Sequence, residues 1–370
     1  MDFSLSPEME ALRDLASGIL ADSSTPDHLT ELDKRGEWLD RQTWTSFADS
    51  GVVGAALPES VGGAGLGFLE LYQVLERVGA AVAQIPLWES VVCGALPIAR
   101  HGSPELIGEL LPGVVTGESL LTAALLEPGA ADPRQPRTTA TRTGEGWRIS
   151  GVKTQVPLAQ LADWILVSAV TEDERSVIVV VRPSAAGVTI EPQKSVSQRP
   201  LARVTFDDVA ADAVLAEPDD GAVLDDVLLH AMTGLAAMQA GVCAEALRRA
   251  AEYTSGRKQF GRPIATFQAV RQRLADSYID VEAIRLTSLQ AAWQLSEGMD
   301  AHRAVEIAKF WAAEGGHRVL YAAQHVHGGI GIDLDYPLHR YFRFGKYIEF
   351  TLGPAKEQLR RLGRRFAAQP

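Results

Sequence analysis

The sequence predicts a multidomain protein of α and β segments in the order helices, strands, helices. Helical periodicity fills the first third, short β-rich runs separated by turns follow it, and helical periodicity then returns. Strands grouped in this way favour an inserted all-β domain over a βαβ sheet. We therefore expect an N-terminal helical domain at 1–118, a middle β-domain at 119–217 and a C-terminal helical domain at 218–370.

The N-terminal third carries clear helix signals. Ser6 is a typical N-cap, Pro7 suits the first helical position, and Glu8 favours the positive end of the helix dipole. Two more helices are expected at 38–50 and 68–79, the second because its apolar residues recur at steps of three and four. The glycine-rich LPESVGGAGLG between them predicts a loop.

The middle segment is rich in residues with high β propensity. The spacing of its runs indicates a small sandwich or barrel, with Ala130 to Thr143 as a loop of poor element formers. The runs are SLLTAAL, GWRISGVKT, DWILVSAV, SVIVVVR, VTIEP and ARVTFDDV.

The last third shows helical periodicity at 223–256, 265–297, 301–325 and 352–366. Gly261 and Pro263 interrupt the first two of these helices and predict a tight turn between them.

That turn displays a candidate binding set. Arg257, Gln259 and Phe260 supply a guanidinium, an amide and an aromatic ring, and Gln268 adds a second amide one helical turn further on. Such a set suits a phosphate and a flat heterocycle. The alternative is a helical hairpin with a solvated basic turn.

Composition narrows the function classes. The net charge of −12 and a pI near 5.2 provide no global basic field for nucleic acid or an anionic membrane. Two cysteines in 370 residues argue against a disulfide framework, and neither a signal peptide nor an apolar run long enough to span a bilayer is apparent. We expect a cytoplasmic protein without nucleic-acid or membrane partners.

The histidines and glycines near residue 328 have two interpretations. His325 and His327 have no cysteine or carboxylate at a companion spacing, so no metal site is expected. Gly328 and Gly329 expose backbone that would let a planar group or pyrophosphate lie close, or they form a helix C-cap followed by a bend. No G-x-G-x-x-G motif follows a strand, so a Rossmann site is unsupported.

Several motifs together resemble the acyl-CoA dehydrogenase family. They are RKQFG, HVHGGIGIDLDYPLHRYFRFGK, TFDDV, LPESVGG and LLEPGA. The resemblance implies an N-terminal helical domain, a middle β-domain, a C-terminal four-helix bundle, and FAD-dependent oxidation of the Cα–Cβ bond of an acyl-CoA thioester. It also implies electron-transfer flavoprotein as the electron acceptor.

The resemblance assigns FAD contacts residue by residue. Arg257, Gln259 and Phe260 correspond to residues that hold the pyrophosphate, and Gln268 corresponds to an adenine-side contact. A second contact strip contains His325, Val326 and Gly329, with His325 in place of the family's usual glutamine. In the family these groups bind the FAD of a neighbouring subunit.

The other half of the family's site is altered. The usual glutamate base aligns with Leu352, the alternative base with Ala231, and the tryptophan that shields the flavin ring with Gln155. No catalytic residue is therefore assigned. The pattern resembles the base-lacking subunit of actinobacterial heteromeric α2β2 acyl-CoA dehydrogenases of steroid side-chain degradation, whose partner chain supplies base and ring pocket.

Two alternatives remain open. One is a self-sufficient homotetramer with a relocated base, for which Glu349 is the main candidate, beside Glu127 and Asp225. Glu349 is also placed to pair with Lys346 or Lys356 on a helix surface. The other is a non-enzymatic scaffold that binds acyl-CoA or flavin.

Overall fold

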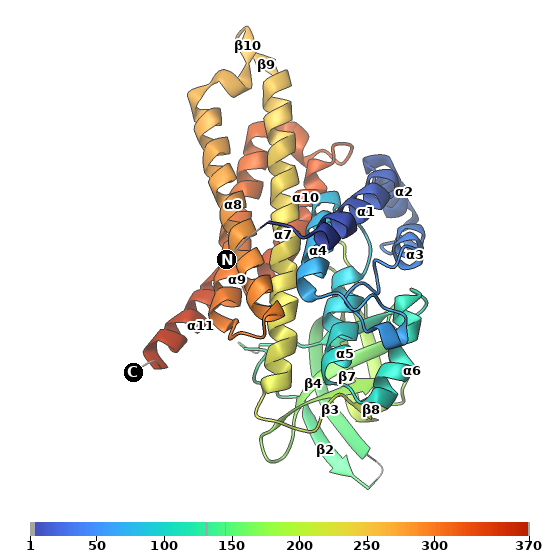
Figure 1. The fold of residues 1–370 in the computed structure, drawn as a ribbon. Coiled ribbons are helices and arrows are strands. Elements are labelled where there is room, and N and C mark those ends of the chain that lie inside the picture. Colours follow the sequence, from blue (N-terminus) through green and yellow to red (C-terminus); the bar gives the residue numbers. More distant parts are fainter. Residues whose placement is uncertain (1–3, 130–131, 145, 369–370) are drawn as a thin grey trace. The chain divides into compact units, whose positions relative to one another are not determined.

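The structure is a computed structural model that describes residues 4–129, 132–144 and 146–368 (Figure 1). The chain forms two compact units. The helical unit combines Met1–Gly36, Phe68–Gln84 and Met232–Pro370, and the mixed unit combines Glu37–Gly67 and Ile85–Ala231.

The helical unit consists of helices and one two-stranded hairpin. Ser6 accepts a hydrogen bond from the Met9 amide at 3.2 Å, which confirms the expected start of the first helix. The elements are α1 (Pro7–Ser23), α2 (Pro26–Arg35), α4 (Phe68–Ala81), most of α7 (Ala222–Gly256), β9 (Lys258–Gln259), β10 (Arg262–Pro263), the 3₁₀ helix η3 (Ile264–Thr266), α8 (Gln268–Ser296), α9 (His302–His327), the 3₁₀ helix η4 (Gly328–Ile332), α10 (Leu338–Phe350) and α11 (Ala355–Ala368).

Two glycines allow helices α4 and α7 to pack closely against each other. Helix α9 packs against α8, α10 and α11. Where α4 meets α7, a Cβ added to Gly79 would lie 2.0 Å from the Met238 carbonyl oxygen, and one added to Gly241 would lie 1.9 Å from that of Glu76. The two helices therefore touch through their main chains, which only glycine at these two positions permits.

The mixed unit joins short helices to a sheet. The helices are α3 (Arg41–Asp49), the 3₁₀ helix η1 (Glu59–Val61), the π-helix η2 (Leu87–Ala95), α5 (Leu96–His101) and α6 (Pro104–Val115). The strands are β1 (Leu121–Ala124), β2 (Thr139–Thr143), β3 (Gly146–Pro157), β4 (Trp164–Val170), β5 (Ser176–Val181), β6 (Val188–Gln193), β7 (Leu201–Ala210) and β8 (Ala213–Val214).

The strands form one mixed sheet in the order β6-β7-β3-β2-β4-β5-β8, and β1 pairs in parallel with β4. Its core is rich in β-branched residues such as Val167, Val179 and Val204. Strand β2 lies within the segment expected to be a loop, because Thr139 to Thr143 find a partner in β3. Residues 130 and 131 of that segment lie outside the described residues.

Two expectations need correction. Helix α10 occupies a basic, aromatic stretch where no helix was expected; Leu338, Tyr341 and Phe344 recur at steps of three and are buried. Helix α7 is long and apolar enough to cross a membrane by composition, contrary to the expectation of no such run. Its most apolar window is 94% buried inside the protein, as in the core helix of a globular protein.

Candidate functional site

The expected turn is a β-hairpin at one end of α7 and α8 (Figure 1). Gln259 pairs with Arg262, and the two residues between them have positive φ, 53° for Phe260 and 77° for Gly261. This is the backbone of a tight two-residue hairpin, which glycine suits and phenylalanine adopts at a steric cost. Phe260 is 92% exposed.

The hairpin presents the first predicted contact set outward. Arg257, Gln259 and Gln268 are all exposed, with Gln268 at the first position of α8. The Phe260 ring meets Phe267 edge to face at 6.2 Å, and that ring in turn lies 4.4 Å below the Arg262 guanidinium. These contacts hold the tip in one arrangement while its polar groups remain accessible.

The second predicted strip lies at the end of α9. His325 and Gly329 are exposed and Val326 is half-buried. Gly328 ends the helix with φ 66°, so the C-cap interpretation of this glycine is confirmed. A Cβ added to Gly329 would meet nothing within 4 Å, so its backbone faces open space.

An aromatic stack brings the two strips to the same end of the bundle. The rings of Tyr253 and His327 lie 4.5 Å apart, and Arg257 donates its amide to the Tyr253 carbonyl at 2.8 Å. His327 Nδ1 donates to the Ala323 carbonyl at 2.7 Å, and its Nε2 lies 3.0 Å from the Tyr336 hydroxyl. Burial lowers the pKa of His327, which favours the neutral ring with Nε2 as acceptor.

The combined surface suits the phosphate-bearing part of a dinucleotide. It offers a guanidinium and two amides as donors, a bare glycine backbone, and an exposed aromatic ring for a flat group. Among the described residues, no group of histidine, cysteine, aspartate and glutamate could hold a metal ion.

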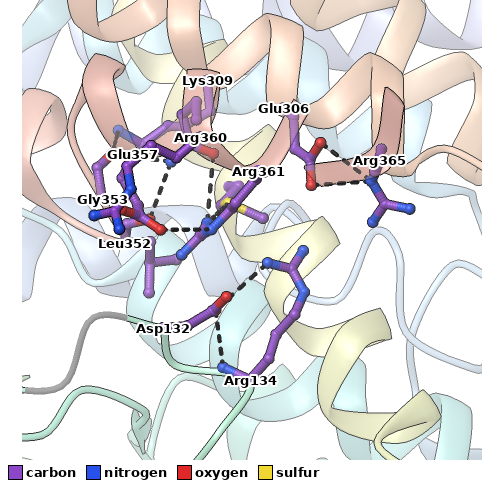
Figure 2. A network of polar contacts seen from close by, with 12 residues as sticks. Asp132, Arg134, Glu306, Lys309, Leu352, Gly353, Glu357, Arg360, Arg361 and Arg365 are labelled. Carbon is purple, nitrogen blue, oxygen red and sulfur yellow. Dashed lines mark hydrogen bonds and ion pairs between the residues drawn. The ribbon is translucent and has the colours of Figure 1, made fainter. Parts of the chain in front are cut away.

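The turn assigned to the usual base carries an apolar side chain. Leu352 is 2% exposed and has φ 57°, and Gly353 follows with φ 105°. The fully buried Lys309 Nζ donates to the carbonyls of Ile348, Glu349 and Gly353 at 2.9, 3.2 and 3.1 Å. Figure 2 shows Lys309 beside Leu352 and Gly353. One ammonium group therefore provides hydrogen bonds to carbonyl groups at the end of α10 and in the turn that follows it.

A second clamp comes from α11. Gln358 Nε2 donates to the carbonyls of Leu352 and Gly353 at 3.3 and 3.1 Å. Burial and the positive charge of Arg361 lower the pKa of Lys309 to about 7. Sequence reasoning missed Lys309 and Gln358; the available signal was a lysine on the apolar face of α9, beside Ala308.

The alternative base position is packed as core. Ala231 is fully buried, and its carbonyl accepts a 2.9 Å hydrogen bond from Nε1 of Trp88 in the π-helix η2. Gln155, assigned to the flavin-shielding tryptophan, is exposed with φ 52°, and its amide donates to Gln193 Oε1 at 2.8 Å. Neither position holds an acid or a large ring.

The other candidate carboxylates are engaged. Glu349 Oε2 lies 2.6 Å from Lys346 Nζ and 3.4 Å from His317 Nδ1. The expected pair with Lys346 therefore forms, but the Lys346 and Glu349 side chains are only 17% and 13% exposed, so it is not a surface pair. Asp225 pairs with Arg134 at 2.5 Å.

Glu127 is the most strongly held of these carboxylates. Its oxygens accept 2.8 Å hydrogen bonds from Lys153 Nζ, the Thr138 amide and hydroxyl, and the Arg137 amide. Burial alone would raise the pKa of Glu127, but Lys153 and Thr138 outweigh it and lower that pKa to about 2. A carboxylate with so little proton affinity is a poor general base at neutral pH.

Comparison with known proteins agrees with this architecture. Three family models match: "Acyl-CoA dehydrogenase, N-terminal domain" at residues 6–118, "middle domain" at 123–209 and "C-terminal domain" at 221–367. Acyl-CoA dehydrogenase FadE27 of Mycobacterium tuberculosis is 40% identical over 380 residues, covering 100% of both chains.

Solved structures are similar over the whole chain. The ChsE4-ChsE5 complex of Mycobacterium tuberculosis contains a chain with a TM-score of 0.94 and 39% identity, covering 100% of both chains. The "Tcur3481-Tcur3483 steroid ACAD G363A variant" contains one with a TM-score of 0.92 and 43% identity, covering 97% of this chain and 98% of that one. The chain belongs to the acyl-CoA dehydrogenase family, whose members are FAD-dependent oxidoreductases acting on CH–CH groups.

Proposed function

We propose that this chain is the base-lacking subunit of a heteromeric α2β2 acyl-CoA dehydrogenase. The proposal depends on a contrast between two parts of the chain. The turn assigned to the base carries a buried leucine, Leu352, whereas the exposed hairpin keeps the polar residues assigned to FAD. A leucine takes no proton, and Ala231 at the alternative position takes none either. A related partner chain therefore supplies the base and the flavin-ring pocket.

In this proposal the chain's own residues bind and orient the FAD of the partner. The Arg257 guanidinium and the Gln259 amide hold the pyrophosphate, beside the exposed ring of Phe260. Gln268 contacts the adenine side, and His325, Val326 and Gly329 form the second strip. When bound, FAD supplies the hydride acceptor for the β-carbon of the acyl group.

The substrate is an acyl-CoA thioester, and we propose a steroid side-chain thioester. Support comes from the similar Tcur3481-Tcur3483 structure, which is a steroid ACAD, and from the two chain names that this structure and the ChsE4-ChsE5 complex each carry. Electron-transfer flavoprotein is the proposed electron acceptor and the cytoplasm the proposed location, both by resemblance to the family.

The self-sufficient homotetramer would need a base, and its main candidate is already paired. Glu349 Oε2 is 2.6 Å from Lys346. Replacing Glu349 with glutamine tests this alternative, because unchanged turnover would remove it as the base.

FAD stoichiometry tests the main proposal. The chain purified alone should hold little FAD, and after co-expression with a related chain the complex should hold one FAD per pair of unlike chains. Within that complex Arg257→Gln should weaken FAD retention, while Arg203→Gln, an exposed arginine on β7, serves as the control. One FAD per chain alone, bleached by an acyl-CoA, would refute the proposal; thioester binding without flavin reduction by the complex would favour the scaffold.

A further inference from the structure

A cavity of about 380 Å³ lies in the helical unit, and neither the residues of the two contact strips nor Leu352 are among its lining residues. Its lining residues come from α1, α2, α4, α7, the start of α10 and the turns next to them. This volume is at the lower end of ligand pockets, which span roughly 300–1,000 Å³. It would therefore suit a small molecule.

The lining is basic although the chain is acidic. Arg77, Arg249 and Arg340 face the cavity, and Glu245 is the one acid among its lining residues. Helices α2 and α10 begin at the cavity while α1 and α4 end there, so their dipoles offset one another. The net positive charge comes from the side chains.

Ion pairs outside the cavity fix two of these guanidiniums. Arg77 Nη2 lies 2.6 Å from Glu76, and Arg340 Nη1 lies 2.7 Å from Asp33. Neither acid lines the cavity. The Arg249 guanidinium lies 5.2 Å from the centre of the Tyr341 ring, whose hydroxyl donates to the Ala80 carbonyl at 3.1 Å.

Several polar atoms of lining residues are buried without a hydrogen-bond partner in the described part of the chain. They are Ser24 Oγ, Arg77 Nε and Arg249 Nε. Arg249 Nε lies 2.8 Å from a Glu245 oxygen but outside hydrogen-bond geometry. Buried polar groups are normally satisfied, so these atoms show that the chain itself leaves part of the hydrogen-bonding capacity of Arg77 and Arg249 unused.

The apolar part of the lining includes a residue with a strained backbone. Val82 follows α4 with φ 46°, a conformation that is costly for a β-branched side chain and natural for glycine after a helix. Its side chain is nevertheless buried against the cavity, near Leu20 and Leu29. Valine adds apolar surface here that glycine would not.

We propose that this cavity binds a small carboxylic acid with an apolar body. The carboxylate meets the guanidiniums of Arg77 and Arg249, and the body lies against Leu20, Leu29 and Val82. This ligand is separate from FAD and from the thioester, so the inference does not rest on the proposed function.

Titration calorimetry with sodium octanoate, using the protein or its purified complex, tests the inference. Saturable binding should weaken about tenfold in Arg249→Gln, equivalent to about 1.4 kcal/mol. Ala81→Leu, which fills the cavity without removing charge, should abolish it. The control is Arg248→Gln, since Arg248 also contacts Glu245 but does not line the cavity.

Two further probes separate the contribution of the carboxylate from that of the apolar body: an alcohol without the charge and an anion without the apolar chain. 1-Octanol and inorganic phosphate should both bind more weakly than octanoate. Equal binding of octanol would reduce the cavity to an apolar hole, and equal binding of phosphate would reduce it to an anion site; either overturns the inference. So would the absence of saturable octanoate binding up to about 10 mM, or binding indifferent to Arg249→Gln and Ala81→Leu.

Discussion

Replacing Glu127 with glutamine should destabilise the mixed unit by about 3 kcal/mol. The pKa of Glu127 is lowered from 4.5 to about 2, and each pKa unit corresponds to roughly 1.4 kcal/mol of interaction with the charged form. Removing one partner of a buried ion pair independently costs about 3–5 kcal/mol. Glutamine also turns an NH₂ group toward donors such as the Arg137 amide, where the carboxylate accepted a hydrogen bond.

The assay is thermal unfolding followed by tryptophan fluorescence. A loss of about 3 kcal/mol should lower the midpoint by roughly 6–12 °C in a unit of this size. Adding Lys153→Met should recover part of the loss, because the unpaired buried ammonium is then gone. Glu191→Gln, in an exposed pair with Arg203 at 3.7 Å, is the matched control and should change stability by less than about 1 kcal/mol.

A midpoint for Glu127→Gln within about 2 °C of the parent would refute this structural account. Loss of turnover in a fully folded Glu127→Gln complex would instead identify Glu127 as a base, although its oxygens already accept hydrogen bonds from Lys153, Thr138 and Arg137. The two readouts therefore separate a structural role from a chemical one.

Three further predictions follow from the same structure. Because the folded pKa of Glu127 lies below its ordinary value, the folded protein binds fewer protons there, so its stabilisation should be present above about pH 4.5 and lost as pH falls toward 2, as a pH series of unfolding midpoints would show. Gly241→Ala should cost about 2–3 kcal/mol in denaturant unfolding, since its Cβ would meet main chain at 1.9 Å, whereas Gly18→Ala, with nothing within 4 Å, should be neutral or stabilising; equal effects would contradict the packing argument. Lys309→Met should remove the Lys309 donor from the carbonyls of Ile348 and Glu349 and one of the two side-chain donors to Gly353, and it should increase hydrogen exchange around Gln358 and the adjoining turn; unchanged exchange would show that the ammonium is dispensable.

Most of the fold was predictable because its signals are local. The Ser6 cap, the periodicity of the long helices and the glycine turn at Gly261 each reside in a few neighbouring residues. Helix α10 was not predicted, because its arginines and aromatic residues were interpreted as a ligand-facing stretch. Its buried face is defined only by packing.

The candidate site was likewise predictable only where its residues lie close together in the sequence. Arg257, Gln259 and Gln268 stand close together in sequence, so their grouping could be predicted and their hairpin found. Lys309 reaches its carbonyl partners across about 40 residues of sequence, with 39 to Ile348 and 44 to Gly353, and no local pattern reveals such a contact. The cavity likewise joins segments from both ends of the chain.

At the Leu352 turn, the contacts that hold the backbone are independent of the side chain that would perform the chemistry. Lys309 and Gln358 grip only main-chain oxygens there, so the left-handed backbone does not depend on which side chain residue 352 carries. Leucine and glutamate are both unbranched at Cβ and pay a similar steric penalty in this conformation. An acid and an apolar side chain can therefore occupy position 352 on the same main-chain support.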